Sequence, residues 1–324
     1  MPIATRLTEL LKIQHPIMLA PMDLVADGRM AATVTRAGGF GIIGGGYGNE
    51  EWLKRELDAA GDARIGVGFI TWSMAKNPRL LDIALTRKPA AIMLSFGDVK
   101  PHAARIKQAG ALMICQVQTV EQAKDAAANG ADVLVAQGAE GGGHGVARGT
   151  FALVPAVVDA ARGIPVAAAG GVADGRGLAA ALMLGADGVL VGTRFYASQE
   201  AAGHPAAKQR IVDASGDRTI RGILFDIARR NVWPAPYGGR VLRNEFSERW
   251  RGREAELLQH QQEESERYAA AHTAGDFDTA AVIAGEAVDL IADIPPAAEI
   301  VARMVKEATT LLAGASNRIR VERA

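Results

Sequence analysis

Residues 132–145, Asp132-Val-Leu-Val-Ala-Gln137-Gly138-Ala-Glu140-Gly-Gly-Gly-His144-Gly145, join an apolar run directly to a loop with five glycines. A continuous apolar run of this length is typical of a buried parallel strand. Glycine lets the backbone approach a ligand closely and adopts positive φ without strain. Glu140 and His144 are the loop's acid–base side chains. The stretch therefore predicts a buried strand that ends in a ligand-binding loop with an imidazole in it.

The same unit, a short apolar run followed by a turn and a helix, recurs along the first 200 residues. The apolar runs predict eight strands: Ile17–Ala20, Phe40–Ile43, Ile65–Ile70, Ala91–Ser95, Leu112–Val117, Val133–Gln137, Val166–Ala169 and Val189–Val191. Amphipathic segments between them predict helices. Strands that alternate with helices form parallel β/α units. Eight units of about 25 residues match a (β/α)8 TIM barrel, and an open doubly wound sheet is the alternative.

The pattern changes after Thr193. Residues 195–250 are irregular and rich in arginine, whereas residues 251–287 and 296–313 have a helical pattern. The arginines are interpreted as a solvated face or as internal ion pairs, with a basic patch as the alternative. We therefore expect two parts: a barrel over residues 1–200 and a C-terminal helical extension over residues 201–324, packed on or over the barrel mouth.

Composition narrows the class of protein. The chain has 324 residues, and its 36 Lys and Arg balance 36 Asp and Glu. This neutral balance argues against nucleic acid or an anionic membrane as a partner. A single cysteine, Cys115, excludes an internal disulfide, and no apolar run reaches membrane-spanning length. The start of the chain shows no secretory signal pattern. These features favour a cytoplasmic protein, with a homo-oligomer left open.

The expected strand ends gather glycines and small polar groups at one rim, where TIM barrels carry their active sites. Gly170-Gly171 and Gly192-Thr193 follow the last two strands, where backbone N–H groups can bind a phosphate. There is no Walker-type lysine motif, and the glycines near residue 40 precede their strand instead of following it. A mononucleotide such as FMN fits better, with its ring over the mouth near Met22 and Gln137.

His144 is the candidate catalytic residue, because its imidazole lies in the glycine loop at this rim. Histidine changes its charge near neutral pH, so His144 can bind an anionic substrate or take a proton from a carbon acid. Glu140 either competes for that role or orients the loop by accepting backbone N–H bonds. The six histidines show no ligand-pair spacing, so no metal site is expected.

Several motifs, taken as an ordered set, resemble the nitronate monooxygenase family, formerly called 2-nitropropane dioxygenases. They cover about residues 1–200 and comprise His15-Pro-Ile-Met18 with Ala20-Pro-Met22, Ala37-Gly-Gly39, Val135–Glu140 through Gly143-His144, Ala169-Gly-Gly-Val172 with Asp174-Gly-Arg-Gly177, and Leu184-Gly-Ala-Asp187 through Gly192-Thr-Arg-Phe195.

The resemblance implies an FMN enzyme that oxidises alkyl nitronates with O2 to carbonyl compounds and nitrite. It implies that His144 is the active-site histidine and that FMN is bound by Ala20, Pro21, Met22, Gln116, Gln137, Gly142, Gly143, Gly170, Gly171, Gly192 and Thr193. Gln116 stands where lysine occurs in relatives, and Gly141 stands where alanine is common. The chain after about Arg210 matches less well. Phe69, Trp72 and Phe96 are candidates for an apolar substrate wall or for core packing.

Two other functions remain open on the sequence. One is an FMN-dependent NAD(P)H reductase, of the quinone or enoyl-acyl-carrier-protein type, on the same barrel. The other is a flavin- or phosphate-binding barrel without enzymatic activity, in which His144 is structural. The sequence selects no natural substrate.

Overall fold

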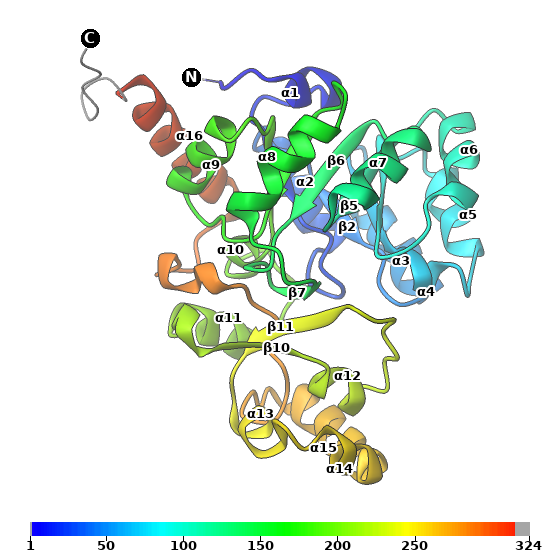
Figure 1. The fold of residues 1–324 in the computed structure, drawn as a ribbon, viewed down its shortest axis with the longest axis vertical. Helices are drawn as coiled ribbons and strands as arrows, with labels where there is room; N and C mark the ends of the chain where they lie inside the picture. The colour runs from blue at the N-terminus through cyan, green and yellow to red at the C-terminus, as the bar shows by residue number, and fades with distance from the viewer. Residues whose placement is uncertain (1, 315–324) are drawn as a thin grey trace.

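Eight parallel strands form a closed ring in the computed structural model, which describes residues 2–314 (Figure 1). The ring order is β1-β9-β8-β6-β5-β4-β3-β2, and a parallel bridge between Met18 and Phe40 joins β1 to the chain just before β2. The bounds are β1 Ile17–Leu19, β2 Ile42–Gly44, β3 Gly66–Ile70, β4 Ala91–Ser95, β5 Leu112–Val117, β6 Val133–Gln137, β8 Val166–Ala169 and β9 Gly188–Val191. The predicted TIM barrel and its eight strands are confirmed.

Helices surround this ring on the outside. They are α2 Gly28–Arg36, α3 Glu50–Ala60, α5 Arg79–Thr86, α6 Lys100–Gln108, α7 Val120–Ala128, α8 Thr150–Ala160 and α9 Gly175–Met183, with short α4 Thr71–Met74 and α10 Thr193–Tyr196 at the ends of β3 and β9. Several begin at a capping side chain: Asp174, for example, accepts the backbone N–H groups of Arg176 and Gly177. Such a cap satisfies donors that the first helical turn leaves free.

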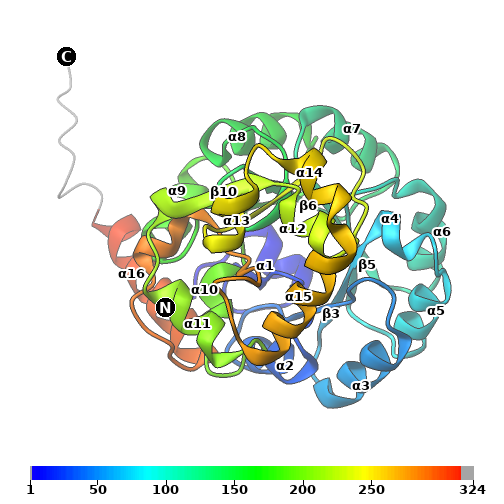
Figure 2. The same cartoon turned by 90° about the horizontal axis from the view of Figure 1, so that it is seen from below.

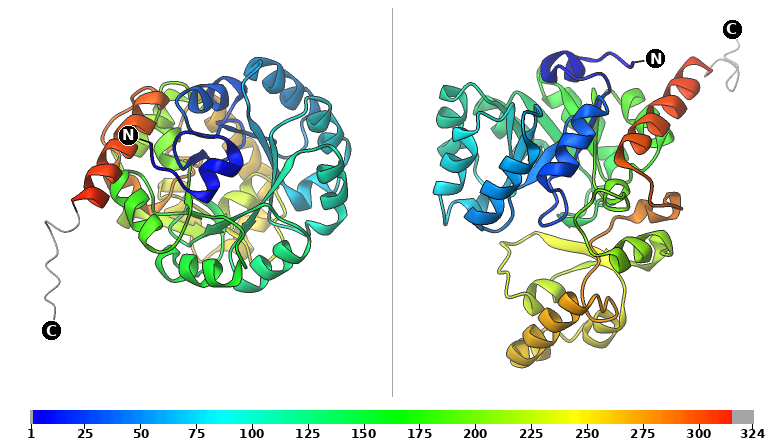
Figure 3. Two further views of the ribbon diagram at one scale, coloured as in Figure 1. Left: turned by 90° about the horizontal axis from the view of Figure 1, so that it is seen from above. Right: turned by 180° about the vertical axis from the view of Figure 1, so that it is seen from behind.

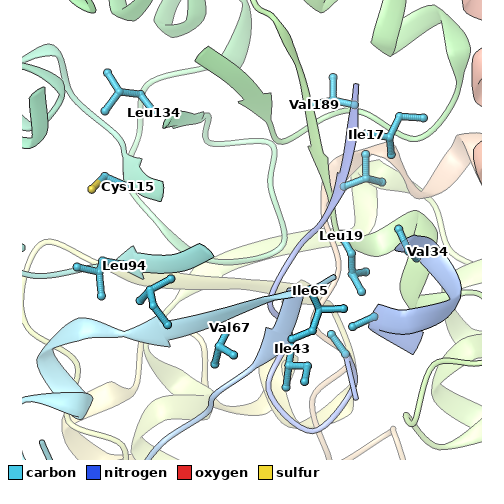
Figure 4. Close-up of a cluster of buried hydrophobic side chains, with 14 of the residues drawn as sticks. Ile17, Leu19, Val34, Ile43, Ile65, Val67, Leu94, Cys115, Leu134 and Val189 are labelled. Carbon is cyan, nitrogen blue, oxygen red and sulfur yellow. The ribbon is translucent and has the colours of Figure 1, made fainter. Parts of the chain in front are cut away.

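Side-chain alternation gives each strand of the sheet two buried faces. In β6, Val133 and Val135 belong to the cluster inside the barrel, whereas Leu134 and Ala136 belong to the cluster between the sheet and its helices. Figure 4 shows part of the outer cluster, including Leu134 and Val189. Each fully buried Leu or Val contributes about 1.5–3 kcal/mol. Both faces of the strands are therefore apolar, which is why the runs look continuous in the sequence.

Helix α1, Arg6–Leu11, covers the amino-terminal end of the barrel (Figure 3, left). Its Leu7 and Leu11 are fully buried and join the inner cluster. A Cβ at Gly188, where β9 begins, would lie 2.6 Å from Leu7 Cδ2, so the helix approaches the strand closely. The carboxyl end of the barrel is left to form the site.

Helix α16, Ala297–Ala313, belongs to the ring of barrel helices. It packs between α9 and α2, and its Ile300, Val301 and Met304 are buried in the outer barrel cluster. The sequence-based boundary at residue 200 assigns this helix to the extension. The structure corrects that boundary, because the chain leaves the barrel after β9 and returns to complete it.

The segment between α10 and α16 lies across the carboxyl end of the barrel (Figures 1 and 2). It contains α11 Pro205–Val212, η1 Gly216–Arg218, β10 Thr219–Gly222, α12 Leu224–Ala228, β11 Gly238–Leu242, α13 Glu245–Trp250, α14 Glu254–Gln259, α15 Gln261–Ala274 and η2 Glu286–Leu290. The expected helical extension is thus wrong in one respect, because two strands lie in its arginine-rich part. No helix of residues 2–314 is long and apolar enough to cross a membrane.

Candidate active site

The glycine–histidine loop is held by a small sheet that the extension completes. Residues Gly143–Gly145 form strand β7, which pairs antiparallel with β11, and β11 pairs with β10. His144 lies opposite Gly239. The sequence predicts a free loop here. The strand was missed because its partner comes from about 95 residues further along the chain, so no local pattern reveals it.

His144 is paired with a buried carboxylate. Its Nε2 lies 3.0 and 2.9 Å from the two carboxylate oxygens of Asp226 on α12. Both residues are less than a tenth exposed. An ionised carboxylate only accepts hydrogen bonds, so Nε2 donates and carries a proton. Nδ1 is then the ring nitrogen left for a substrate.

A tryptophan covers one face of the same imidazole. The ring of Trp233 stacks on His144 with 3.4 Å between centroids and 6° between planes. The indole N–H donates to the hydroxyl of Tyr47, at 3.0 Å. Trp233 follows α12 in the segment that leads to β11, so the extension supplies both the carboxylate partner and the cover of His144.

Three glutamine amides lie beside the histidine. Gln116 and Gln118 donate to the side-chain oxygen of Gln137, at 2.7 and 2.8 Å, and Gln137 donates to the backbone oxygen of His144, at 3.1 Å. The side-chain oxygen of Gln118 is buried without a hydrogen-bond partner among residues 2–314. A buried acceptor without a donor is costly, which marks this place as one where a ligand can bind.

The glycine loop is fixed by two charged side chains that do not touch the imidazole. Glu140 accepts the backbone N–H and the hydroxyl of Thr150, with distances of 2.8–2.9 Å. Arg221 donates to the backbone oxygens of Ala139, Gly141 and Gly143. Burial, together with nearby Arg240, lowers the pKa of Arg221 to about 10. Glu140 therefore acts as the loop support that the sequence analysis weighed against a catalytic role.

The two expected phosphate-binding turns have the geometry of close backbone approach. Gly170 and Gly171 have φ of +95° and +76°, which only glycine adopts without strain. Helix α10 begins at Thr193, immediately after Gly192. The hydroxyl of Thr193 accepts the N–H of Gly285, at 3.0 Å, so its own hydrogen stays available to donate.

The turn after β1 lies beside the turn after β9. The N–H of Ala20 donates to the backbone oxygen of Val191, and a Cβ at Gly192 would meet Ala20 and the sulfur of Met22 at 3.5 and 3.7 Å. Pro21 fills the barrel instead, because a Cβ at Gly68 would lie 2.3 Å from its ring.

Not every glycine in the loop is explained by a ligand. A Cβ at Gly142 would lie 2.7 Å from the carbonyl carbon of Ala284, so the extension itself requires glycine there. Gly143 has φ of +73°. Gly141 approaches the next turn, with a Cβ that would lie 3.4 Å from Gly170 Cα. Packing within the protein therefore explains some of the loop glycines, which the sequence alone attributes to cofactor binding.

The candidate residues form one continuous part of the rim. We call it the glycine–amide arc: it consists of the residues at the ends of β1, β9, β8, β6 and β5, which are neighbours in the ring. Its members are Ala20, Pro21, Met22, Gln116, Gln118, Gln137, Gly142, Gly143, Gly170, Gly171, Gly192 and Thr193. Of these, Gln118 is absent from the sequence-based set.

A different set of residues follows the remaining strands, β2, β3 and β4. We call Tyr47, Trp72 and Phe96 the aromatic arc. Tyr47 follows β2, Trp72 follows β3 and Phe96 follows β4. Phe96 and Trp72 contact Trp233 edge to face, with centroids 5.0 and 5.3 Å apart. Burial raises the pKa of Tyr47 to about 12, which keeps its hydroxyl protonated. The candidate wall residues Trp72 and Phe96 lie here, whereas Phe69 is buried in the outer core.

The sequence analysis did not predict roles for Asp226, Trp233 and Tyr47. Asp226 and Trp233 contact His144, and Tyr47 accepts a hydrogen bond from Trp233. Asp226 is 82 residues from His144, and nothing in its local sequence sets it apart. Among residues 2–314, no three His, Cys, Asp or Glu side chains come together as a metal site.

The chain is similar to proteins of known family and structure. The family described as nitronate monooxygenase matches residues 4–65 and 63–307. A nitronate monooxygenase of Neurospora crassa is 34% identical over 345 residues, covering 91% of this chain and 89% of the relative. The structure of FabK from Thermotoga maritima superposes with a TM-score of 0.85 at 31% identity, covering 98% of this chain and all of that one.

A third relative has another named activity. The (3aS,4S,5R,7aS)-5-hydroxy-7a-methyl-1-oxo-octahydro-1H-indene-4-carboxyl-CoA dehydrogenase of Mycobacterium tuberculosis is 36% identical over 225 residues. The match covers 68% of this chain and 63% of the relative. Proteins similar to this chain therefore carry out more than one reaction.

Proposed function

Because the chain belongs to the nitronate monooxygenase family, we propose that it is an FMN-dependent enzyme that oxidises alkyl nitronates with O2 to carbonyl compounds and nitrite. The observation that carries the proposal is the buried pair of His144 and Asp226, which lies between the glycine–amide arc and the aromatic arc. It gives an acid–base group a fixed orientation at the end of the barrel where active sites occur.

The chain's residues fit an FMN phosphate. In TIM barrels a phosphate commonly binds the turns after the seventh and eighth strands together with a short extra helix. Here those turns contain Gly170-Gly171 and Gly192, and α10 is the short helix. The first-turn N–H groups of a helix lack intrahelical partners, and the hydroxyl of Thr193 adds a donor. We expect these groups to hold the phosphate.

The amides fit the other end of the cofactor. The pyrimidine edge of a flavin presents both N–H donors and carbonyl acceptors. Gln116, Gln118 and Gln137 can match both kinds of group, and the buried oxygen of Gln118 has no donor within residues 2–314. A flavin N–H would satisfy that oxygen. When bound, FMN supplies the redox chemistry between the nitronate and O2.

His144 and Asp226 have a defined task towards the substrate. With Nε2 donating to Asp226, Nδ1 can take a proton from a carbon acid, and the imidazolium that forms is stabilised by the carboxylate. The protonated Nδ1 then donates to an oxygen of the anionic nitronate. The aromatic arc shields this ion pair from water, which strengthens it.

The test is direct. FMN-loaded protein mixed aerobically with propyl-2-nitronate should consume O2 and release nitrite and acetone. Failure to release nitrite from an enzyme with full FMN occupancy would refute the proposed activity.

An NAD(P)H-dependent reductase is the second candidate. The likeness to FabK over 98% of this chain and the relative named as a dehydrogenase favour it. Anaerobic mixing with NADH distinguishes the two: the proposed monooxygenase keeps its oxidised flavin spectrum on the time scale of turnover, whereas a reductase loses it.

A further inference from the structure

We propose that Trp233 is a built-in occupant of the substrate site, and that the substrates it gives way to are nitronates bearing a planar aromatic group. The substrate part of this inference rests on the proposed function. The site itself is the space between His144 and the aromatic arc, formed by Tyr47, Trp72 and Phe96.

The indole of Trp233 is bound there as a flat ligand would be. One face lies on the imidazole of His144, 3.4 Å away between centroids. Trp72, Phe96 and Tyr237 approach it edge to face, with centroids 5.3, 5.0 and 6.3 Å away. Edge-to-face and stacked contacts are the preferred geometries of aromatic pairs. The enclosure therefore matches a planar, apolar ring.

Polar groups suited to an anion belong to the aromatic arc and to Thr71, the residue next to Trp72. The indole N–H of Trp72 and the hydroxyl of Thr71 are buried without partners among residues 2–314. The hydroxyl of Tyr47 accepts from Trp233 and, because burial keeps it protonated, can donate once the indole leaves. Unpaired buried donors are costly, and the oxygens of a nitronate would satisfy them.

The backbone at this site has a conformation that is uncommon for a bulky residue. Phe96 has φ of +63°, a conformation that bulky residues rarely adopt. This turn aims the ring of Phe96 at Trp233 and Tyr237. Strained backbone of this kind occurs preferentially at functional sites.

Solvent-exposed residues flank Trp233 on both sides. Val232 is 83% exposed, and Pro234, Ala235 and Pro236 are exposed as well. The indole thus anchors a segment whose neighbouring side chains face solvent. Its displacement costs one hydrogen bond and the ring contacts, and an aromatic substrate restores the ring contacts.

The enclosure is separate from the expected FMN site. In the ring of strands, β3 lies opposite β8 and β4 lies opposite β9. Trp72 and Phe96 therefore stand across the mouth from Gly171 and Gly192. His144 is the residue that both halves can reach.

Binding of two unreactive carboxylates tests the inference. Phenylacetate and propionate imitate the nitronates of phenylnitromethane and nitroethane, and calorimetry on the FMN-loaded protein measures each dissociation constant. We expect phenylacetate to bind about tenfold or more tightly than propionate, the scale of one or two aromatic contacts. Trp233→Ala should tighten phenylacetate about tenfold by removing the competing indole. Phe96→Ala should weaken phenylacetate.

The control is Trp52→Phe, since Trp52 donates to Gly44 outside the enclosure and should leave both constants unchanged. Weaker phenylacetate binding in Trp233→Ala would make Trp233 a fixed wall and overturn the inference. So would equal affinity for the two carboxylates, or release of FMN by phenylacetate. Nitrite production from propyl-2-nitronate is measured in parallel, so the proposed function can fail while the binding result stands, and the reverse.

Discussion

The glycine–amide arc and the aromatic arc share one barrel mouth but are assembled by different means. Most of the first comes from turns that directly follow strands, and its contacts are between neighbours in the ring, such as Gln116 with Gln137. The residues of the second also follow strands, but they pack on Trp233, which the extension places against Tyr47 across 186 residues of sequence. The residues expected to bind FMN are thus brought together mostly by local structure, whereas the proposed substrate side also needs contacts between distant parts of the chain.

The largest effect is expected where the two arcs meet. His144→Ala removes the imidazole at the junction, so kcat should fall about 10²-fold or more, the scale of losing an acid–base group. FMN content, measured from the absorbance spectrum, should be unchanged. His260→Ala on the exposed surface is the matched control. Unaltered turnover in His144→Ala would reject its catalytic role.

Asp226→Asn tests whether the extension positions that imidazole. The substitution keeps the size of the side chain but removes the charge that stabilises the imidazolium. A hydrogen bond to a charged group contributes about 1.5–3 kcal/mol, so kcat should fall roughly tenfold to 150-fold while KM for the nitronate changes little. Steady-state kinetics measure both, and a change confined to KM would contradict a positioning role.

Gly142→Ala tests the packing of the extension on the glycine loop. Its Cβ would meet the backbone of Ala284 at 2.7 Å, and forced overpacking costs about 1–3 kcal/mol. The free energy of unfolding from urea titration should fall by that amount. Gly222→Ala is the control, since its Cβ meets nothing within 4 Å. Equal stability of the two variants would contradict this prediction, because it would show that the backbone at Ala284 shifts at little cost.

Thr193→Val should have the smallest effect and should act on one arc alone. It removes a hydroxyl that donates to the expected phosphate and accepts from Gly285. We expect the dissociation constant of FMN, measured by flavin fluorescence titration, to rise about tenfold. This corresponds to a loss of about 1.4 kcal/mol of binding free energy. Phe96→Ala should leave that constant unchanged, and an equal rise in both variants would erase the distinction between the arcs.

The barrel can be predicted from the sequence because each β/α unit has its own local sequence pattern. Continuous apolar runs specify strands buried on both faces, and the glycines of Gly170-Gly171 mark turns with positive φ. The same local logic finds His144. Two strands of the extension escape prediction, since β11 is stabilised by pairing with the distant β7, and β10 by pairing with β11.

The partners of His144 escape for a related reason. Asp226 and Trp233 reach it only through the fold of the extension, so neither spacing nor composition reveals the pair. The position of helix α16 is hard to predict for the same reason. Its apolar face indicates that the helix is buried, but not that it packs on the barrel between α9 and α2.

A crystal structure of the protein with FMN and phenylacetate tests the division of the mouth most directly. Electron density should show the phosphate at Gly171, Gly192 and Thr193, and the phenyl ring between Trp72, Phe96 and His144 in the place of the Trp233 indole. An isoalloxazine ring between Trp72 and Phe96, or a phosphate away from the turns after β8 and β9, would contradict the account.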